Sequence, residues 1–140
     1  MAYNENVTFL IFAINGIHYA IENTKVQEII QNAKIYHLPF VPAYIEGVIN
    51  CHGTPYTAVN PVLLFDLEGE KVIPNGTFLV FKRDDDQFAM HISSIDMFFE
   101  VEEEDVDVDN NTIRYKNMNV PVFDANLIED RLLQDLGAND

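Results

Sequence analysis

The chain has 140 residues, of which 48% are hydrophobic, and its 23 acidic against 8 basic side chains give a formal net charge of -15. This length fits one domain with its own core, and the hydrophobic share argues against a disordered chain. The chain lacks the clustered Lys and Arg that phosphate binding needs, which argues against nucleic acid and anionic membrane surfaces as partners.

No linker-like stretch divides the sequence, so we expect residues 1–140 to form a single domain. No uninterrupted apolar run approaches the roughly 18 residues of a membrane span, and the opening MAYNEN lacks the basic and then apolar order of a secretory signal. The only cysteine, Cys51, cannot form an internal disulfide. We therefore expect a cytoplasmic protein with no direct membrane insertion.

The first predicted element is a β-hairpin over residues 7–21. In VTFLIFAINGIHYAI, two apolar runs rich in β-branched and aromatic residues meet at Asn15-Gly16. This dipeptide tolerates the positive φ angles of a type I′ turn, which makes the hairpin the clearest local prediction in the sequence.

The hydrophobic period then changes. Val26, Ile29 and Ile30 fall at helical spacing, which predicts a short helix near residues 24–31. Pro39 prevents its extension. The next segments, YIEGVIN, TPYTAV and PVLLFDL, are short, apolar and punctuated by Gly and Pro, as in a small barrel or sandwich.

The second half continues in the same β style. TFLVFK and FAMHI flank an acidic turn at residues 83–87 and predict a second hairpin, and SSIDMFFEV reads as another strand or a bend. TIRYK and VPVFD bracket residues 117–119 as a third hairpin. The tail differs, because leucines at helical spacing behind Asp124 predict a C-terminal helix near residues 125–136.

Cys51 and its neighbour His52 raise the question of a reactive site. A nucleophilic thiol needs a lowered pKa and a base within hydrogen-bond reach. Adjacent side chains on an extended strand point to opposite faces, so the adjacency argues against contact between the two. We expect an inert, buried Cys51 and no catalytic residue, so the protein is predicted not to be an enzyme.

The sequence offers two candidate patterns for metal binding. One thiol and four histidines scattered over residues 18–91 do not provide the short spacings of a zinc site. Residues 105–116, DVDVDNNTIRYK, begin like a calcium loop, but Asn110 stands where Gly is needed and Lys116 where a bidentate Glu is needed. We expect a solvated acidic edge there and neither a metal site nor a cofactor, with weak calcium binding or an enzymatic activity kept as the lesser alternatives.

The order of segments resembles the CheW family of chemotaxis coupling proteins. KVQEII, residues 25–30, matches the family pattern V-x-E-I. The family pattern P-x-x-I-x-G-V-x-N-L-R-G is matched at family spacing by Pro42, Ile45, Gly47, Val48, Asn50 and Gly53. FAMHISSIDMFFEV resembles a later family segment, with Ile95 and Phe98 at its valine positions. The likeness spans about residues 7–136.

The resemblance implies a mainly β fold of two small five-stranded β-barrels that share a hydrophobic core. It also implies a non-catalytic adaptor that couples the cytoplasmic tip of methyl-accepting chemoreceptors to the histidine kinase CheA, through the CheW-like regulatory domain of that kinase. A CheW-like scaffold of another, non-chemotaxis signalling system is the alternative. The residues carried over as partner-binding are Val26, Glu28, His52, Ile95 and Phe98.

The apolar members of this set could equally belong to the core, whereas Glu28 is less easily explained by packing. The sequence departs from the family at three informative positions. His52 stands where the family has Arg, so a permanent, forked cation is replaced by an imidazole. Asn60 stands where the family has Asp, and Cys51 takes a Leu position as a small apolar filler.

Overall fold

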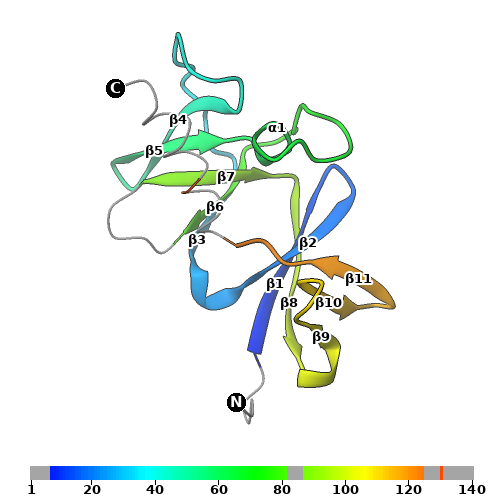
Figure 1. Cartoon of the computed structure of the whole chain (residues 1–140). Helices are drawn as coiled ribbons and strands as arrows, with labels where there is room; N and C mark the ends of the chain where they lie inside the picture. Colours follow the sequence, from blue (N-terminus) through cyan, green and yellow to red (C-terminus); the bar gives the residue numbers. More distant parts are fainter. Residues whose placement is uncertain (1–6, 82–86, 125–129, 131–140) are drawn as a thin grey trace.

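The computed structural model describes residues 7–81, 87–124 and 130. Its strands form two groups, one built on β3 to β7 and one on β1, β2 and β8 to β11 (Figure 1). The strands, in chain order, are β1 (Val7–Ile14), β2 (Ile17–Glu22), β3 (Val26–Ile30), β4 (Ile45–Cys51), β5 (Thr54–Val59), β6 (Thr77–Phe81), β7 (Phe88–Ile92), β8 (Ser94–Val101), β9 (Val106–Asp107), β10 (Thr112–Tyr115) and β11 (Met118–Pro121). Two 3-10 turns, η1 (Asn23–Lys25) and η2 (Glu103–Asp105), and a one-turn helix, α1 (Pro61–Leu64), complete the described elements. No helix among the described residues is long and apolar enough to cross a membrane.

The strands pair into three sheets. The largest has the order β3-β6-β7-β5-β4, with β5 and β7 parallel and the other neighbours antiparallel. The other two have the orders β2-β1-β8 and β11-β10-β9. A parallel bridge between Ala20 and Val122 joins these two smaller sheets. The expected mainly β fold in two parts is confirmed, although the sheets do not close into a single continuous barrel.

The hairpin at Asn15-Gly16 is confirmed. Both turn residues have positive φ, 50° and 88°, as a type I′ turn requires. The pairing of β6 with β7 is confirmed as well. The third hairpin pairs β10 with β11 as expected, but its turn lies at Lys116 and Asn117, which have positive φ of 47° and 63°. Residues 118 and 119 are therefore in the strand and not in the turn.

The prediction of a short helix near residues 24–31 is wrong. The segment is the turn η1 followed by strand β3, which pairs antiparallel with β6. The register shifts between Val26 and Glu28, so Gln27 is a surplus residue of the kind found in a β-bulge. A bulge breaks the alternation of a strand, which explains why the apolar residues follow a spacing that mimics a helix.

PVLLFDL was expected to continue the β pattern, and it instead begins with α1. Asn60 caps this turn, because its side-chain oxygen accepts from the backbone N–H groups of Val62 and Leu63, and Pro61 occupies the first helical position, where no N–H is needed. The helix expected near residues 125–136 lies outside the described residues, apart from Asp130.

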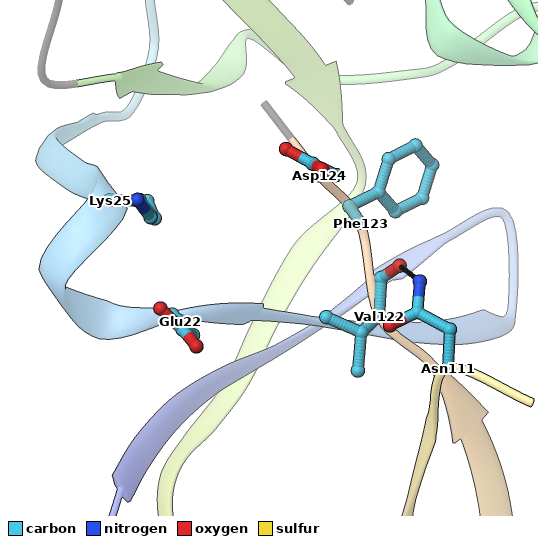
Figure 2. A pocket seen from close by; sticks show the side chains of 6 residues that line it. All are labelled: Glu22, Lys25, Asn111, Val122, Phe123 and Asp124. Carbon is cyan, nitrogen blue, oxygen red and sulfur yellow. Dashed lines mark hydrogen bonds between the residues drawn. The ribbon is translucent and has the colours of Figure 1, made fainter. Parts of the chain in front are cut away.

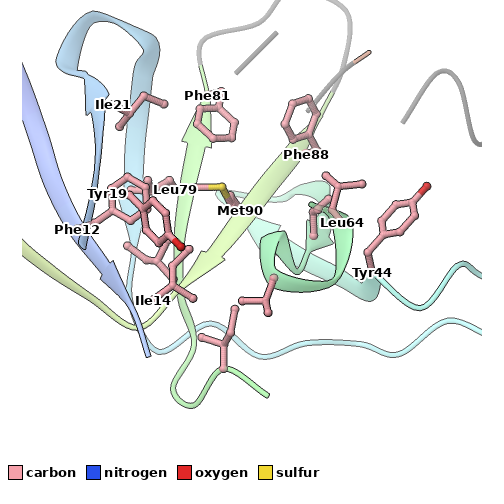
Figure 3. Close-up of a cluster of buried hydrophobic side chains, with 14 of the residues drawn as sticks. Phe12, Ile14, Tyr19, Ile21, Tyr44, Leu64, Leu79, Phe81, Phe88 and Met90 are labelled. Atoms are coloured by element: carbon pink, nitrogen blue, oxygen red, sulfur yellow. The ribbon is translucent and has the colours of Figure 1, made fainter. Parts of the chain in front are cut away.

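The core has three parts. One cluster fills the group of β1, β2 and β8 to β11, a second fills the five-stranded sheet, and the largest lies between the two groups. Figure 3 shows that the largest cluster gathers side chains from both groups, with Phe12 and Tyr19 on one side and Leu79, Phe88 and Met90 on the other. The shared core expected from the sequence is therefore present.

Three ladders contain one surplus residue each, and all three residues are polar. They are Gln27 in β3, Glu46 in β4 and Asp96 in β8. Bulges redirect side chains and increase local twist. In two of the three, the redirected side chain bonds an aromatic partner: Glu46 bonds His91, and Asp96 bonds Tyr115.

Candidate protein-binding and polar side-chain sites

Glu28 joins the two edges of the five-stranded sheet. Strands β3 and β4 stand at opposite ends of the strand order, yet the Glu28 carboxylate on β3 accepts a hydrogen bond from the Cys51 Sγ at 3.1 Å. It also accepts one from the His52 Nε2 at 2.8 Å. The sheet therefore curls until its edges approach, and at this point side chains connect them.

His52 reaches Glu28 because the strand ends just before it. Cys51 is the last residue of β4, and His52 and Gly53 form the following turn with positive φ of 53° and 84°. The turn is held by the side chain of Asn50, which accepts from the Gly53 N–H at 2.7 Å. The expectation that Cys51 and His52 point to opposite faces is wrong, since the alternation of a strand no longer applies at a left-handed residue.

The three side chains run from the interior to the surface. Cys51 is only 6% exposed and packs in the core of the five-stranded sheet, which confirms the expected buried cysteine. The Glu28 side chain is 34% exposed and that of His52 is 78% exposed. We call this group the Glu28 trio.

The electrostatics of the Glu28 trio are those of a carboxylate with two donors. The hydrogen bonds from Cys51 and then His52 lower the pKa of Glu28. Burial, followed by the neighbouring carboxylate, raises the pKa of Cys51 to about 11. A reactive cysteine needs the opposite shift, so this thiol is poorly suited to act as a nucleophile even though an imidazole lies close to it.

The remaining expected partner-binding residues are dispersed. Val26 and Ile95 are partly buried and pack against the largest core cluster, whereas Phe98 is 51% exposed on β8. Met97, beside Phe98, is 40% exposed. Glu28 and His52 lie at the edge of the five-stranded sheet, whereas β8 belongs to the β2-β1-β8 sheet. The five residues therefore form two separate surfaces, and their binding role stays a prediction.

A second polar cluster surrounds Asp96 at the bulge in β8. The Tyr115 hydroxyl donates a hydrogen bond to the Asp96 carboxylate, and Lys116 and His18 approach the same oxygen at 4.0 and 3.9 Å. Burial, and then the bond to Asp96, raise the pKa of Tyr115. This cluster could not be predicted from the sequence, because the partners come from β2, β8, β10 and the turn that follows β10.

The acidic segment shows no calcium geometry among the described residues. The Asp107 carboxylate accepts from the Asn110 backbone N–H at 3.2 Å and side-chain amide at 2.7 Å, and these bonds lower its pKa. Across residues 7–81 and 87–124, the Glu28 trio is the one group of three or more His, Cys, Asp or Glu that could hold a metal ion. The lesser alternative of weak calcium binding at residues 105–116 stays a prediction.

A pocket of about 180 Å³ lies beside residues 122–124, which directly follow β11 (Figure 2). Glu22 and Lys25 come from the η1 side, and Asn111 holds the opposite wall through a hydrogen bond from its side-chain amide to the Val122 carbonyl at 3.0 Å. This pocket combines one cation, acidic side chains and Phe123. It contains no grouping typical of catalysis.

The fold and these surfaces define a β domain of two halves on one core, with a polar cluster at a sheet edge and an apolar edge strand. Residues 8–126 match the family described as the CheW-like domain. The chain therefore belongs to the CheW-like domain family.

Two relatives illustrate the similarity. The "Chemotaxis protein CheW" of Helicobacter pylori (strain ATCC 700392 / 26695) is 28% identical over 119 residues, which cover 80% of this chain and 72% of the relative. The crystal structure of the scaffolding protein TtCheW from Thermoanaerobacter tengcongensis superposes with a TM-score of 0.71 over 85% of this chain and 89% of that one. Its sequence identity of 12% means that it shows the shared fold alone.

Proposed function

We propose that the protein is a non-catalytic adaptor of a chemotaxis-type signalling array, which couples chemoreceptors to the histidine kinase CheA. The observation that carries this proposal is the family match across residues 8–126. The similarity to a chemotaxis protein CheW over most of both chains supports the same role.

The first proposed contact surface is the edge that carries Val26, Glu28 and His52. His52 is largely exposed and Glu28 partly so, and both are fixed by their mutual hydrogen bond. Pre-ordered side chains lose less conformational entropy when a partner binds, so this edge is suited to recognition. The net charge of -15 favours a partner with a basic face.

The second proposed surface is strand β8, where Ile95 and Phe98 lie. Among the described strands, β8 pairs only with β1 and is therefore an edge of its sheet. Phe98 and Met97 are both exposed on it. An apolar edge strand is a feature that soluble proteins avoid unless another chain covers it, which supports a partner there.

The non-catalytic part of the proposal rests on Cys51. Its burial and its raised pKa of about 11 argue against this thiol as a nucleophile. The family of the chain supports the same conclusion, since the resemblance is to adaptors without catalytic activity.

The test is a binding experiment with the CheA regulatory domain and a receptor tip from the same organism. We expect the folded protein to bind both, and we expect His52→Ala and Phe98→Ser to weaken different partners because they lie on separate surfaces. Val108→Ser is the matched control, since Val108 is 77% exposed and belongs to neither surface. Folded protein that binds neither partner would reject the chemotaxis role.

The same experiment addresses the alternative of a CheW-like scaffold in another signalling system. The observation that favours this alternative is His52, which stands where the family has Arg and whose Nε2 donates to Glu28. If His52→Arg creates binding to CheA or the receptor that the natural chain lacks, the natural chain serves another system. If the natural chain already binds, the alternative is removed.

A further inference from the structure

We propose that Glu28, Cys51 and His52 form a binding site for one Zn²⁺ ion at the edge of the five-stranded sheet. The three residues offer a carboxylate oxygen, a thiol sulfur and an imidazole nitrogen. These ligand atoms all lie within 4.8 Å of one another. The sequence did not predict this group, because the three residues meet only when the sheet curls.

The spacing of the ligand atoms is close to that of a bound ion. In a tetrahedral zinc site, bonds of about 2.0 to 2.3 Å place neighbouring ligand atoms roughly 3.3 to 3.6 Å apart. Here a Glu28 oxygen lies 3.1 Å from the Cys51 Sγ, and the other lies 2.8 Å from the His52 Nε2. Both distances are a few tenths of an ångström shorter than in a bound site, so the Glu28 carboxylate must draw back slightly to admit the ion.

The types of ligand atom in the trio favour Zn²⁺ over other ions. Zn²⁺ accepts mixed sulfur, nitrogen and oxygen ligands, whereas Ca²⁺ and Mg²⁺ require oxygen ligands only. One carboxylate and one thiolate also balance the two positive charges of the ion. The acidic chain as a whole, at -15, favours the approach of a cation.

Binding replaces two hydrogen bonds by bonds to the metal. The Cys51 thiol loses its proton to solvent, and the sulfur then binds the ion as a thiolate, since a metal deprotonates a coordinating thiol. His52 binds through the Nε2 lone pair, with its ring proton on Nδ1. One of the two Glu28 oxygens becomes the third ligand, and water completes the tetrahedron.

The exposure of the trio allows an ion to enter. His52, at 78% side-chain exposure, is open to solvent, and Glu28 is partly exposed, while Cys51 provides the inner ligand. A bound ion would link β3 to the end of β4, which share no ladder in the described sheets. The site should therefore also stabilise the fold.

The experiment uses the full chain without an affinity tag, treated with a chelator and then titrated with Zn²⁺. We expect one ion per chain by calorimetry and a melting temperature that rises with Zn²⁺ concentration. Co²⁺ in place of Zn²⁺ should give a sulfur-to-cobalt charge-transfer band in the near ultraviolet, which requires the Cys51 sulfur.

Variants identify the ligands. His52→Gln changes an exposed side chain and should weaken binding more than about tenfold, because even the loss of an outer-shell partner costs that much. Cys51→Ser should abolish the cobalt band. His37→Gln is the matched control, since His37 is exposed and lies outside the trio. It should bind like the natural chain.

The proposal is overturned if Zn²⁺ leaves the melting temperature unchanged, or if Co²⁺ gives no sulfur band. It is also overturned if His52→Gln and His37→Gln bind equally, because scattered carboxylates would then account for the binding. These measurements use the isolated chain, so their failure would leave the proposed adaptor function untouched.

Discussion

The Nδ1 atom of His91 lies 2.6 Å from a carboxylate oxygen of Glu46, and this pair ties β7 to the bulge in β4. The other ring nitrogen faces the Asn75 carbonyl at 2.6 Å, and the ring stacks on Phe78 with centroids 4.4 Å apart. His91 is 1% exposed, so both of its polar atoms depend on these partners.

Replacing Glu46 should therefore destabilise the fold. Glu46→Ala leaves a buried ring nitrogen without its acceptor, which should lower the free energy of unfolding by about 2 kcal/mol. Denaturation in urea measures this. Glu70→Ala removes an exposed carboxylate as the control and should change stability by less than about 0.5 kcal/mol. Equal effects of the two changes would contradict the prediction.

Gly47 should tolerate no side chain. Its φ is 147°, and an added Cβ would overlap the main-chain carbonyl of Tyr36. Tyr36 lies in the loop between β3 and β4, and this carbonyl accepts a hydrogen bond from the Val48 N–H of β4. Because backbone cannot move aside cheaply, Gly47→Ala should cost about 3 kcal/mol.

Gly16→Ala is the matched control for Gly47. Gly16 also has positive φ, 88°, but a Cβ there meets nothing within 4 Å. The backbone strain alone should cost about 1 kcal/mol. Thermal unfolding of both variants separates crowding from strain, and a Gly16 variant as unstable as the Gly47 variant would show that crowding is not the cause.

Asn60 should not be replaceable by the Asp that the family pattern has there. The residue is 2% exposed, and while its side-chain oxygen caps α1, its amide donates to the Lys71 carbonyl at 2.7 Å. A carboxylate could cap the turn but would face that carbonyl without a proton to donate. Asn60→Asp should therefore cost about 1 to 3 kcal/mol.

The control for Asn60 is Asn32→Asp. Asn32 is exposed with positive φ of 59°, a conformation that Asn and Asp both tolerate. We expect almost no change in the urea midpoint for this control. If Asn60→Asp is equally silent, the bond to Lys71 contributes nothing to stability.

Tyr115→Phe should destabilise the protein in a pH-dependent manner. At neutral pH the loss of the bond to Asp96, which is 35% exposed on its side chain, should cost about 1 kcal/mol. The pKa of Tyr115 is raised in the folded state, so the folded chain holds this proton more tightly than the unfolded chain does. The stabilisation is complete below the unfolded pKa of about 10 and is lost as pH rises through the folded value.

The difference in unfolding free energy between the natural chain and Tyr115→Phe should therefore shrink as pH rises above about 10. Lys116 and His18 face the same Asp96 oxygen and remain in both proteins. Urea denaturation at each pH measures the difference. A gap that is constant or widens over this range would be inconsistent with a raised pKa at Tyr115.

Local chemistry made part of the fold predictable. The turn at Asn15-Gly16 follows from two neighbouring residues that accept positive φ, and the strands on each side follow from their composition. Strand β3 could not be predicted in the same way, because the surplus Gln27 is set by the pairing with β6. Helix α1 has only four residues, too few for a periodic signal, although Asn60 and Pro61 together mark its start.

The candidate site was predictable in its residues and not in its geometry. The family pattern singled out Glu28 and His52, and the structure places them in direct contact. Nothing in the sequence connects Cys51 to Glu28, since 23 positions separate them and their strands share no ladder. The contact depends on the curvature of all five strands, which is a property of the whole sheet.

The meeting of β3 and β4 has a mechanical consequence. The two strands share no ladder, but the chain that follows β3 is bonded to β4 through the main-chain bridge between Tyr36 and Val48. The Glu28 side chain adds a second connection at the end of β4, where it bonds Cys51 and His52. The curl of the five-stranded sheet is therefore held at two points along β4, one made of main chain and one of side chains.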